Sequence, residues 1–132
     1  MIGLSKKLLL CFCLCLGLAA MKAQYRFDHW TTDDGLPQNS VYSIVQMPDG
    51  YIWLTTFDGL VRFDGVRFTV FNKGNSPNLP NNRLRKMLAN GNDLWIMTEE
   101  NNPVRFRGGE FICDFTKQGL VLYLVLHSKL NK

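Results

Sequence analysis

The sequence predicts an all-β fold made of very short antiparallel strands. The first observation is the stretch from Asp49 to Gly65, where three Asp-Gly pairs separate runs of β-branched and aromatic residues. Asp-Gly favours tight hairpins because glycine accepts a positive φ and aspartate tolerates it. The second observation is an internal repeat with an offset of 42 or 43 residues. Four short antiparallel strands in ~40–45 residues form one β-propeller blade. The pattern therefore predicts an incomplete β-propeller, with about two blades plus flanking strands.

Residues 1–23 are predicted to be a signal peptide that is removed from the folded protein. A pair of lysines precedes an uncharged apolar run from Leu8 to Ala20. This run is shorter than the ~20 residues of a membrane-spanning helix and has the length of a signal-peptide core. We expect cleavage after Ala23, with Ala20 as the competing site, and export to the periplasm.

Two other interpretations of this leader stay open. An uncleaved leader would act as a membrane anchor. A lipoprotein would use Cys11, Cys13 or Cys15, but a lipid-modified cysteine needs small residues before it, and bulky residues precede all three. We therefore prefer the cleaved signal peptide.

Cleavage changes both the charge and the cysteine count. It removes three of the 15 basic residues, which leaves the mature chain with one more basic residue than its 11 acidic ones. A nearly neutral chain of this kind has no electrostatic footprint for nucleic acid. Cleavage also leaves Cys113 as the single cysteine, so no intrachain disulfide is expected even in an oxidising compartment.

Three pairs of segments define the repeat. They are Leu36-Pro37-Gln38-Asn39 with Leu79-Pro80-Asn81-Asn82, Ile52–Thr56 with Leu94–Thr98, and Phe63–Phe68 with Phe106–Phe111. Because the matches keep one order and nearly one offset, they predict two equivalent units. Repeat 1 spans residues 34–71 and the degenerate repeat 2 spans residues 72–111.

Each unit is expected to contain four strands. They lie near residues 41–46, 51–55, 60–63 and 67–71 in repeat 1, and near 83–88, 93–98, 103–107 and 110–115 in repeat 2. Residues 24–33 are expected to form an N-terminal outer strand, because Phe27 and Trp30 have the spacing of Phe68 and Phe71. Residues 112–132 are expected to be the start of a third repeat or an aberrant tail, with an apolar, β-prone run at 121–126.

The string DGLPQNSVYSIVQMPDGYIWLTTFDGLVRFDGVRFTVF, from Asp34 to Phe71, resembles the two-component regulator propeller repeat. Repeat 2 keeps part of this pattern but loses the Asp-Gly-Leu segment, where residues 100–103 stand instead. The positions expected to have structural roles in the repeat are Gly35, Leu36, Pro37, Asn39, Gly50, Trp53, Thr56, Gly59, Leu60, Phe63, Gly65, Phe68, Leu79, Pro80, Asn82, Trp95, Thr98, Phe106, Gly108 and Phe111.

The resemblance implies the periplasmic sensor region of a hybrid two-component regulator, with oligosaccharides as ligands. A transmembrane helix and a histidine kinase would follow in such a receptor, so the chain resembles an N-terminal fragment that a gene break, a frameshift or a choice of expressed segment has shortened. Its expected partners are further propeller blades, from missing chain or from self-association, and a membrane only through the parent receptor or an uncleaved leader. The alternative is a free-standing secreted lectin-like protein that completes a propeller by oligomerisation.

No pattern predicts catalytic, cofactor-binding or metal-binding residues. His29 and His127 are far apart, and the Asp-Gly turns lack the alternating oxygen ligands of a calcium loop. Turn formation is the better explanation of those aspartates. Enzymatic activity is therefore not expected.

Aromatic and basic residues are the candidates for ligand contact. Trp53 and Trp95 recur at one position per unit, which favours a role in the core between blades over stacking on sugars. Trp30, Tyr42 and Tyr51 are similar candidates with a greater chance of exposure. Arg83, Arg85 and Lys86 form a basic cluster that could contact an acidic sugar. Strict alternation would split them between two faces of a strand, which favours a solvated face instead.

Overall fold

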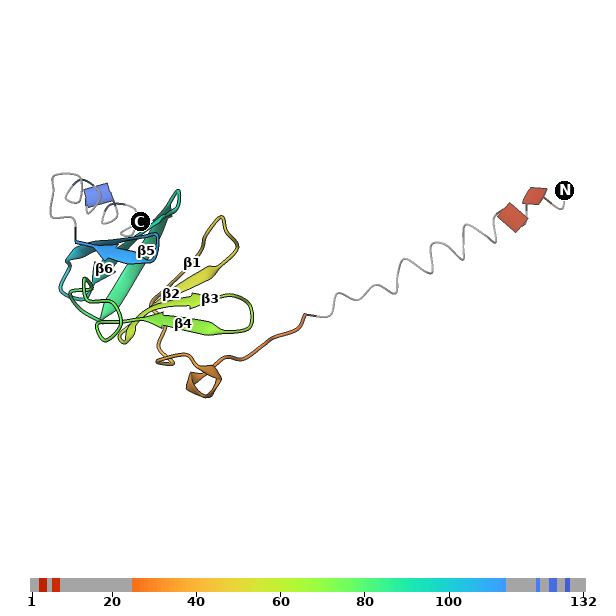
Figure 1. Ribbon diagram of the computed structural model, residues 1–132. Coiled ribbons are helices and arrows are strands. Elements are labelled where there is room, and N and C mark those ends of the chain that lie inside the picture. Colours follow the sequence, from red (N-terminus) through yellow and green to blue (C-terminus); the bar gives the residue numbers. More distant parts are fainter. Residues whose placement is uncertain are drawn as a thin grey trace.

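The computed structural model describes residues 3–4, 6–7, 25–113, 121, 124–125 and 128. Two four-stranded antiparallel sheets dominate it, and in each the strands follow one another in chain order (Figure 1). Blade 1 comprises β1 (Ser43–Gln46), β2 (Ile52–Thr56), β3 (Gly59–Phe63) and β4 (Phe68–Phe71). Blade 2 comprises β5 (Leu84–Asn90), β6 (Asp93–Thr98), β7 (Pro103–Arg107) and β8 (Glu110–Ile112). The predicted all-β class and the eight predicted strands are confirmed, with strand ends shifted by a few residues.

Tight turns at glycine explain why the strands can be so short. Gly50, Gly59 and Gly65, the glycines of the three Asp-Gly pairs, all have a positive φ. Gly59 is the most constrained, because a Cβ placed there would lie 2.3 Å from the carbonyl oxygen of Phe71. Blade 2 has no equivalent of the Asp58-Gly59 pair. In the corresponding turn, Asn101 adopts a positive φ of 62°. Asparagine tolerates this conformation better than most residues do, so the degenerate repeat keeps the hairpin.

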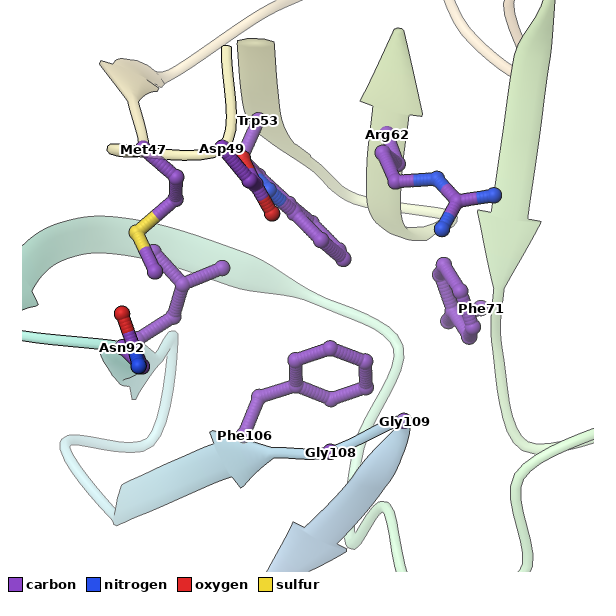
Figure 2. A pocket seen from close by; sticks show the side chains of 10 residues that line it. Met47, Asp49, Trp53, Arg62, Phe71, Asn92, Phe106, Gly108 and Gly109 are labelled. Carbon is purple, nitrogen blue, oxygen red and sulfur yellow. The ribbon is translucent and has the colours of Figure 1, made fainter. Parts of the chain in front are cut away.

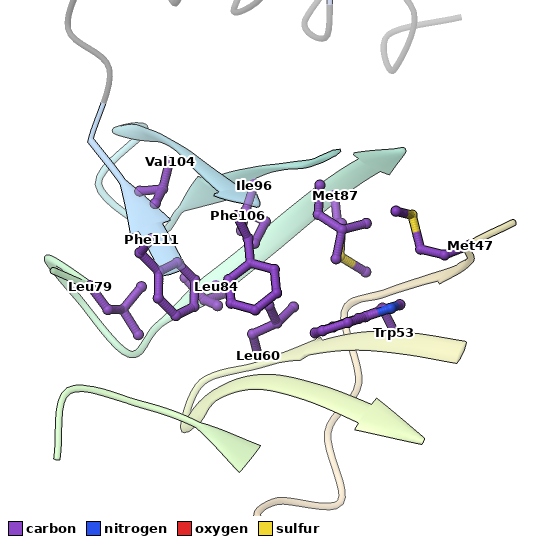
Figure 3. Close-up of a cluster of buried hydrophobic side chains, with 11 residues drawn as sticks. Met47, Trp53, Leu60, Leu79, Leu84, Met87, Ile96, Val104, Phe106 and Phe111 are labelled. Atoms are coloured by element: carbon purple, nitrogen blue, oxygen red, sulfur yellow. The ribbon is translucent and has the colours of Figure 1, made fainter. Parts of the chain in front are cut away.

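The two blades pack face to face through one hydrophobic cluster, which we call the seam core (Figure 3). Blade 1 contributes Met47, Trp53 and Leu60. Blade 2 and the loop before it contribute Leu79, Leu84, Met87, Leu94, Ile96, Val104, Phe106 and Phe111. Fully burying one large apolar side chain stabilises a fold by roughly 1.5–3 kcal/mol. The seam core is therefore the main attraction between the blades.

The opposite face of blade 1 holds a smaller cluster. Leu36, Leu54 and Val61 are its buried members, and Phe68 packs against them from the edge. Trp30 covers part of this face, with its ring centroid 4.9 Å from that of Phe63 and 5.7 Å from that of Phe68. The segment before the first repeat thus shields apolar surface that no described strand covers.

The predicted outer strand at residues 24–33 has no strand pairing in its described part. Residues 25–31 pair with no described strand, and a 3-10 turn occupies Thr32–Asp34. Thr31 caps this turn, since its hydroxyl accepts from the Asp33 N–H while the Asp34 carboxylate accepts from the Thr31 N–H at 2.8 Å. A strand needs a partner for its backbone groups, and the capping box that follows this segment satisfies only the N–H groups of Thr31 and Asp33.

Strand β5 corrects a second expectation, because it contains a β-bulge. The register between β5 and β6 shifts between Leu84 and Lys86, and the buried residues of β5 are Leu84 and Met87, three positions apart. If side chains alternated strictly along the strand, Lys86 would lie on the same buried face as Leu84. Arg83 and Arg85 would then lie on the opposite face. A bulge inserts one residue and changes the direction of the side chains that follow. All three basic residues are therefore exposed, and the predicted split between two faces is wrong.

The chain ends fall mostly outside the described residues. This applies to the predicted signal peptide, residues 1–23, and to the predicted third repeat start near residues 115–120. Val121, Leu124, Val125 and Ser128 are helical, so the β-prone expectation for residues 121–126 fails where it can be compared. Leucine has a high helix propensity. Within the described residues, no helix has the length and apolar character needed to cross a membrane.

Candidate functional site

An asparagine that recurs once in each repeat stabilises the loop before each blade. Asn39 and Asn82 stand before the first strand of each blade, and each side-chain oxygen accepts a backbone N–H, from Thr32 at 2.9 Å and from Lys73 at 2.7 Å. They therefore fasten the loops through which the chain enters the blades.

The repeated threonines organise the turn at the end of the second strand of each blade. Thr56 is fully buried; its hydroxyl donates to the carbonyl of Gly59 at 3.0 Å and accepts from the N–H of Asp58 at 3.1 Å. Thr98, also fully buried, accepts from the N–H of Asn102 at 3.1 Å. These threonines hold the turns together and are not accessible to a ligand.

Trp53 and Trp95 are both buried. Trp53 lies in the seam core with its ring centroid 5.1 Å from that of Phe106. Its indole nitrogen is buried and has no hydrogen-bond partner among the described residues. Trp53 therefore acts mainly through its apolar area, and the low exposure of both tryptophans favours a packing role over stacking on a sugar.

Each tryptophan has an arginine as its cross-strand neighbour, a repeated pair that the sequence analysis missed. Trp53 pairs with Arg62, and Trp95 with Arg105. The Arg62 guanidinium lies 4.7 Å from the ring centroid of Tyr51, and that of Arg105 lies 5.3 Å from the ring of Trp95. The two arginines are 43 residues apart, so the repeat offset could have revealed them. Their position on the aromatic rings favours a packing role.

A pocket of about 190 Å³ lies in the seam, at the end of the blades where the β1–β2, β5–β6 and β7–β8 turns meet (Figure 2). Its walls include the rings of Trp53, Phe71 and Phe106 and the polar side chains of Asp49, Arg62 and Asn92. Pockets that enclose drug-sized ligands have roughly 300–1,000 Å³. The seam pocket is therefore too small for an oligosaccharide.

A more suitable group lies at the opposite end of the blades, next to the β2–β3 turn. Tyr42 and Phe57 stack with ring centroids 4.1 Å apart and planes inclined by 17°. The Arg83 guanidinium lies 4.1 Å from the ring centroid of Phe57. Tyr42 is 45% exposed, so this stack presents aromatic surface to solvent.

Two arginines on this surface share one carboxylate. Glu99 forms an ion pair with the Arg83 guanidinium through both of its oxygens, and Arg85 reaches the same carboxylate at 3.4 Å. Hydrogen bonding from Arg83 lowers the pKa of Glu99, and the bonded carboxylate raises the pKa of Arg83. Glu99 and Arg83 are therefore both charged near neutral pH. We call Tyr42, Phe57, Arg83, Arg85 and Glu99 the aromatic–arginine cluster.

Sequence reasoning identifies this cluster only in part. Tyr42, Arg83 and Arg85 are among its candidates, whereas Phe57 and Glu99 are not. Phe57 stands in a turn and Glu99 directly follows a strand, so neither belongs to a periodic pattern. Lys86, the third basic candidate, is exposed on β5 but has no described contact with the cluster's carboxylate.

Within the described residues, no group of three or more His, Cys, Asp and Glu side chains is arranged to hold a metal ion. Cys113 is a free thiol that lies 3.2 Å from the carbonyl oxygen of Asn78. Burial raises its pKa, so the protonated thiol is favoured near neutral pH.

Comparison with known proteins agrees with this geometry. Residues 35–58 match the family model of the two component regulator propeller. A 70-residue stretch, 53% of the chain, is 39% identical to histidine kinase P4 of Formosa agariphila, and it corresponds to 5% of that protein's length. The matched family segment covers the loop before blade 1, strands β1 and β2 and the turn with Phe57. Residues 35–58 are therefore similar to a two component regulator propeller repeat, and the chain corresponds to only a small part of the histidine kinase that it matches.

Proposed function

We propose that this chain is the ligand-sensing propeller part of a two-component regulator, that it is exported to the periplasm, and that its ligands are oligosaccharides. The observation that carries the proposal is the match of residues 35–58 to the two component regulator propeller. The similarity to a histidine kinase supports a signalling context. The role is binding, with catalysis assigned to a kinase elsewhere in the receptor.

The aromatic–arginine cluster supports a carbohydrate ligand. Exposed aromatic rings offer apolar faces on which the C–H face of a sugar ring can pack, and guanidinium groups offer several fixed donors for hydroxyl or acidic groups. The cluster also combines residues from both blades, since Tyr42 and Phe57 belong to blade 1 and Arg85 to blade 2. Ligand contact there would depend on the relative position of the blades, as a sensor requires.

A thermal-shift screen of the full chain against a panel of plant, algal and host oligosaccharides tests the ligand class. A ligand that binds only the folded state stabilises it by about 1.4 kcal/mol at a concentration ten times its Kd. We expect at least one oligosaccharide to raise the Tm, and a panel without any effect would contradict the proposed ligand class. A discrete trimer or tetramer in sedimentation, together with tight sugar binding, would instead favour the secreted lectin-like alternative.

Export is tested separately by the N-terminus of the protein isolated from the periplasm. We expect mass spectrometry to find Gln24 as the first residue, because Ala23 is the preferred cleavage position. A chain that keeps Met1 and sediments with membranes would support the uncleaved anchor.

A further inference from the structure

Within the aromatic–arginine cluster, Arg85 makes far fewer contacts through its guanidinium group than Arg83 does. Arg83 is held by Glu99 through a two-point ion pair and lies over Phe57. Arg85 has a single 3.4 Å contact with the same carboxylate, lies 5.7 Å from the ring centroid of Phe57, and has 53% of its side chain exposed. A guanidinium group has five N–H donors, so most of those of Arg85 face solvent.

The charges around the cluster show how an anion would be recognised. Arg83 and Arg85 share one glutamate, and exposed Lys86 follows them on β5. Asp58 contacts the amide of Asn82, and Glu100 accepts from the amide of Asn81. The acidic and basic groups nearly balance, so a bound anion would depend on direct contact with Arg85 and not on a broad positive field.

The position of Arg85 is fixed from two sides. Its backbone carbonyl accepts a hydrogen bond from the Thr55 hydroxyl of blade 1 at 3.0 Å. The shared Glu99 restricts its side chain. A guanidinium that is already ordered loses less conformational entropy when it binds. The exposed Tyr42 ring lies in the same cluster, on the Phe57 ring.

We propose that the aromatic–arginine cluster is a subsite for an acidic sugar residue, one that carries a carboxylate or a sulfate. Tyr42 packs against the apolar face of the sugar ring, and Arg85 binds the anionic substituent, with two parallel hydrogen bonds where the geometry allows. Arg83 and Glu99 position this pair. This proposal rests on the proposed function and narrows its ligand class from oligosaccharides in general to anionic ones.

The test compares trigalacturonate with its fully methyl-esterified form, which has the same backbone without charge, by calorimetric titration of the full chain. A sulfated chondroitin disaccharide distinguishes sulfate from carboxylate as the preferred anion. We expect trigalacturonate or the sulfated sugar to bind at least tenfold more tightly than the ester. We also expect Arg85→Ala to weaken that binding at least tenfold, since a hydrogen bond to a charged group contributes about 1.5–3 kcal/mol.

Three variants separate the subsite from effects on folding. Lys86→Ala removes an adjacent positive charge and should keep the affinity, whereas Tyr42→Ala should lose most of it. Arg85→Lys should recover only part of the affinity, because lysine lacks the planar fork. All three should keep the parent Tm within a few degrees.

Three outcomes overturn the proposal. The first is equal binding of trigalacturonate and its ester without any effect of Arg85→Ala, which would leave the broader sensor function intact. The second is an equal loss of affinity in Lys86→Ala and Arg85→Ala, which would indicate attraction by general charge. If neither anionic sugar binds at millimolar concentration, the subsite is also excluded, and the wider oligosaccharide screen then decides the proposed function independently.

Discussion

Blade 1 and blade 2 have the same strand order but bury equivalent positions to very different extents. Ile44 pairs with Leu54 in blade 1, and Met87 pairs with Ile96 at the matching place in blade 2. Ile44 is 65% exposed, whereas Met87 is 3% exposed. The difference follows from neighbours, because blade 1 covers this face of blade 2 and no described strand covers the same face of blade 1. In a repeat fold, the adjacent blade determines which apolar residues form core.

The comparison also separates sequence conformity from structural contribution. Blade 1 contains the Asp-Gly turns and most of the segment that matches the family model, yet it supplies three of the eleven buried residues of the seam core. Blade 2 departs from the repeat pattern, but every residue of its β6 strand is buried. The better match to the family is therefore not the better-packed blade.

The largest expected effect on stability comes from truncating Trp53, the large blade 1 side chain in the seam core. Trp53→Ala should lower the free energy of unfolding by about 3–5 kcal/mol, the cost of truncating a buried aromatic residue. Trp30→Ala is the matched control, because Trp30 is 39% exposed and lies against the other face of blade 1. Chemical denaturation of the full chain measures both. Equal losses would mean that the seam core is not the dominant contact.

The pair Met87→Ala and Ile44→Ala tests the role of the neighbour directly. We expect Met87→Ala to cost about 2–5 kcal/mol because it leaves a cavity in the seam core. Ile44→Ala should cost less than about 1 kcal/mol, since its side chain is largely in solvent. If Ile44→Ala were as damaging as Met87→Ala, another surface would have to cover blade 1 in solution.

A comparison of two glycines sharpens the account of the turns in blade 1. Gly59→Ala should cost more than about 2 kcal/mol, because the new Cβ would meet the Phe71 carbonyl in a conformation that L-residues rarely adopt. Gly65 also has a positive φ, but nothing lies within 4 Å of the position that a Cβ would take there. Gly65→Ala should therefore cost only about 1–2 kcal/mol. Thermal unfolding of both variants gives the difference, and similar losses would show that backbone conformation alone limits these sites.

The smallest expected effect concerns acid and salt. Backbone N–H groups of Arg67 and Val66 lower the pKa of Asp64 in blade 1, and Arg83 lowers the pKa of Glu99 in blade 2. A carboxylate whose pKa is lower in the folded state contributes stability above its unfolded pKa of about 4, and this stability is lost as the pH falls through the folded pKa. We expect the Tm to fall below about pH 4.

The effect of salt on the Tm should distinguish the contributions of the two carboxylates. Asp64→Ala removes the acceptor of the hydrogen bonds from the Val66 and Arg67 N–H groups, so its effect on the Tm should persist at high salt. Glu99→Gln removes an exposed ion pair, so its effect should shrink in ~1 M NaCl. Differential scanning fluorimetry of the two variants in low and high salt measures this. The opposite dependence would contradict the assigned causes of the two pKa shifts.

Much of the fold is predictable from the sequence, because local signals and the repeat agree. The Asp-Gly pairs mark turns, and the offset between Trp53 and Trp95 places the strands of the degenerate unit. The segment at residues 25–34 is the exception, since the spacing of Phe27 and Trp30 suggests a strand while the Thr31 and Asp34 capping box forms a turn. The spacing of apolar residues indicates which side chains lie on one face. A segment forms a strand only when a neighbouring strand pairs with its backbone groups.

The candidate site is less predictable for a different reason. Tyr42, Phe57 and Glu99 lie outside the regular strands, where no periodicity indicates which side chains meet. Arg83 and Arg85 are visible as part of a basic cluster, but the alternation rule fails at the bulge between Leu84 and Lys86. The three-residue spacing between the apolar Leu84 and Met87 is the signal that could have revealed this bulge.

The bulge in β5 has a consequence for how such repeats can diversify. It adds one residue between Leu84 and Met87, and both of these apolar side chains still lie in the interior. Loss of that single residue would leave one basic side chain fewer beside the Phe57 ring, with little change to the packed interior. Ligand preference in related blades could therefore change through small length differences in one strand, independently of the selection that maintains the fold.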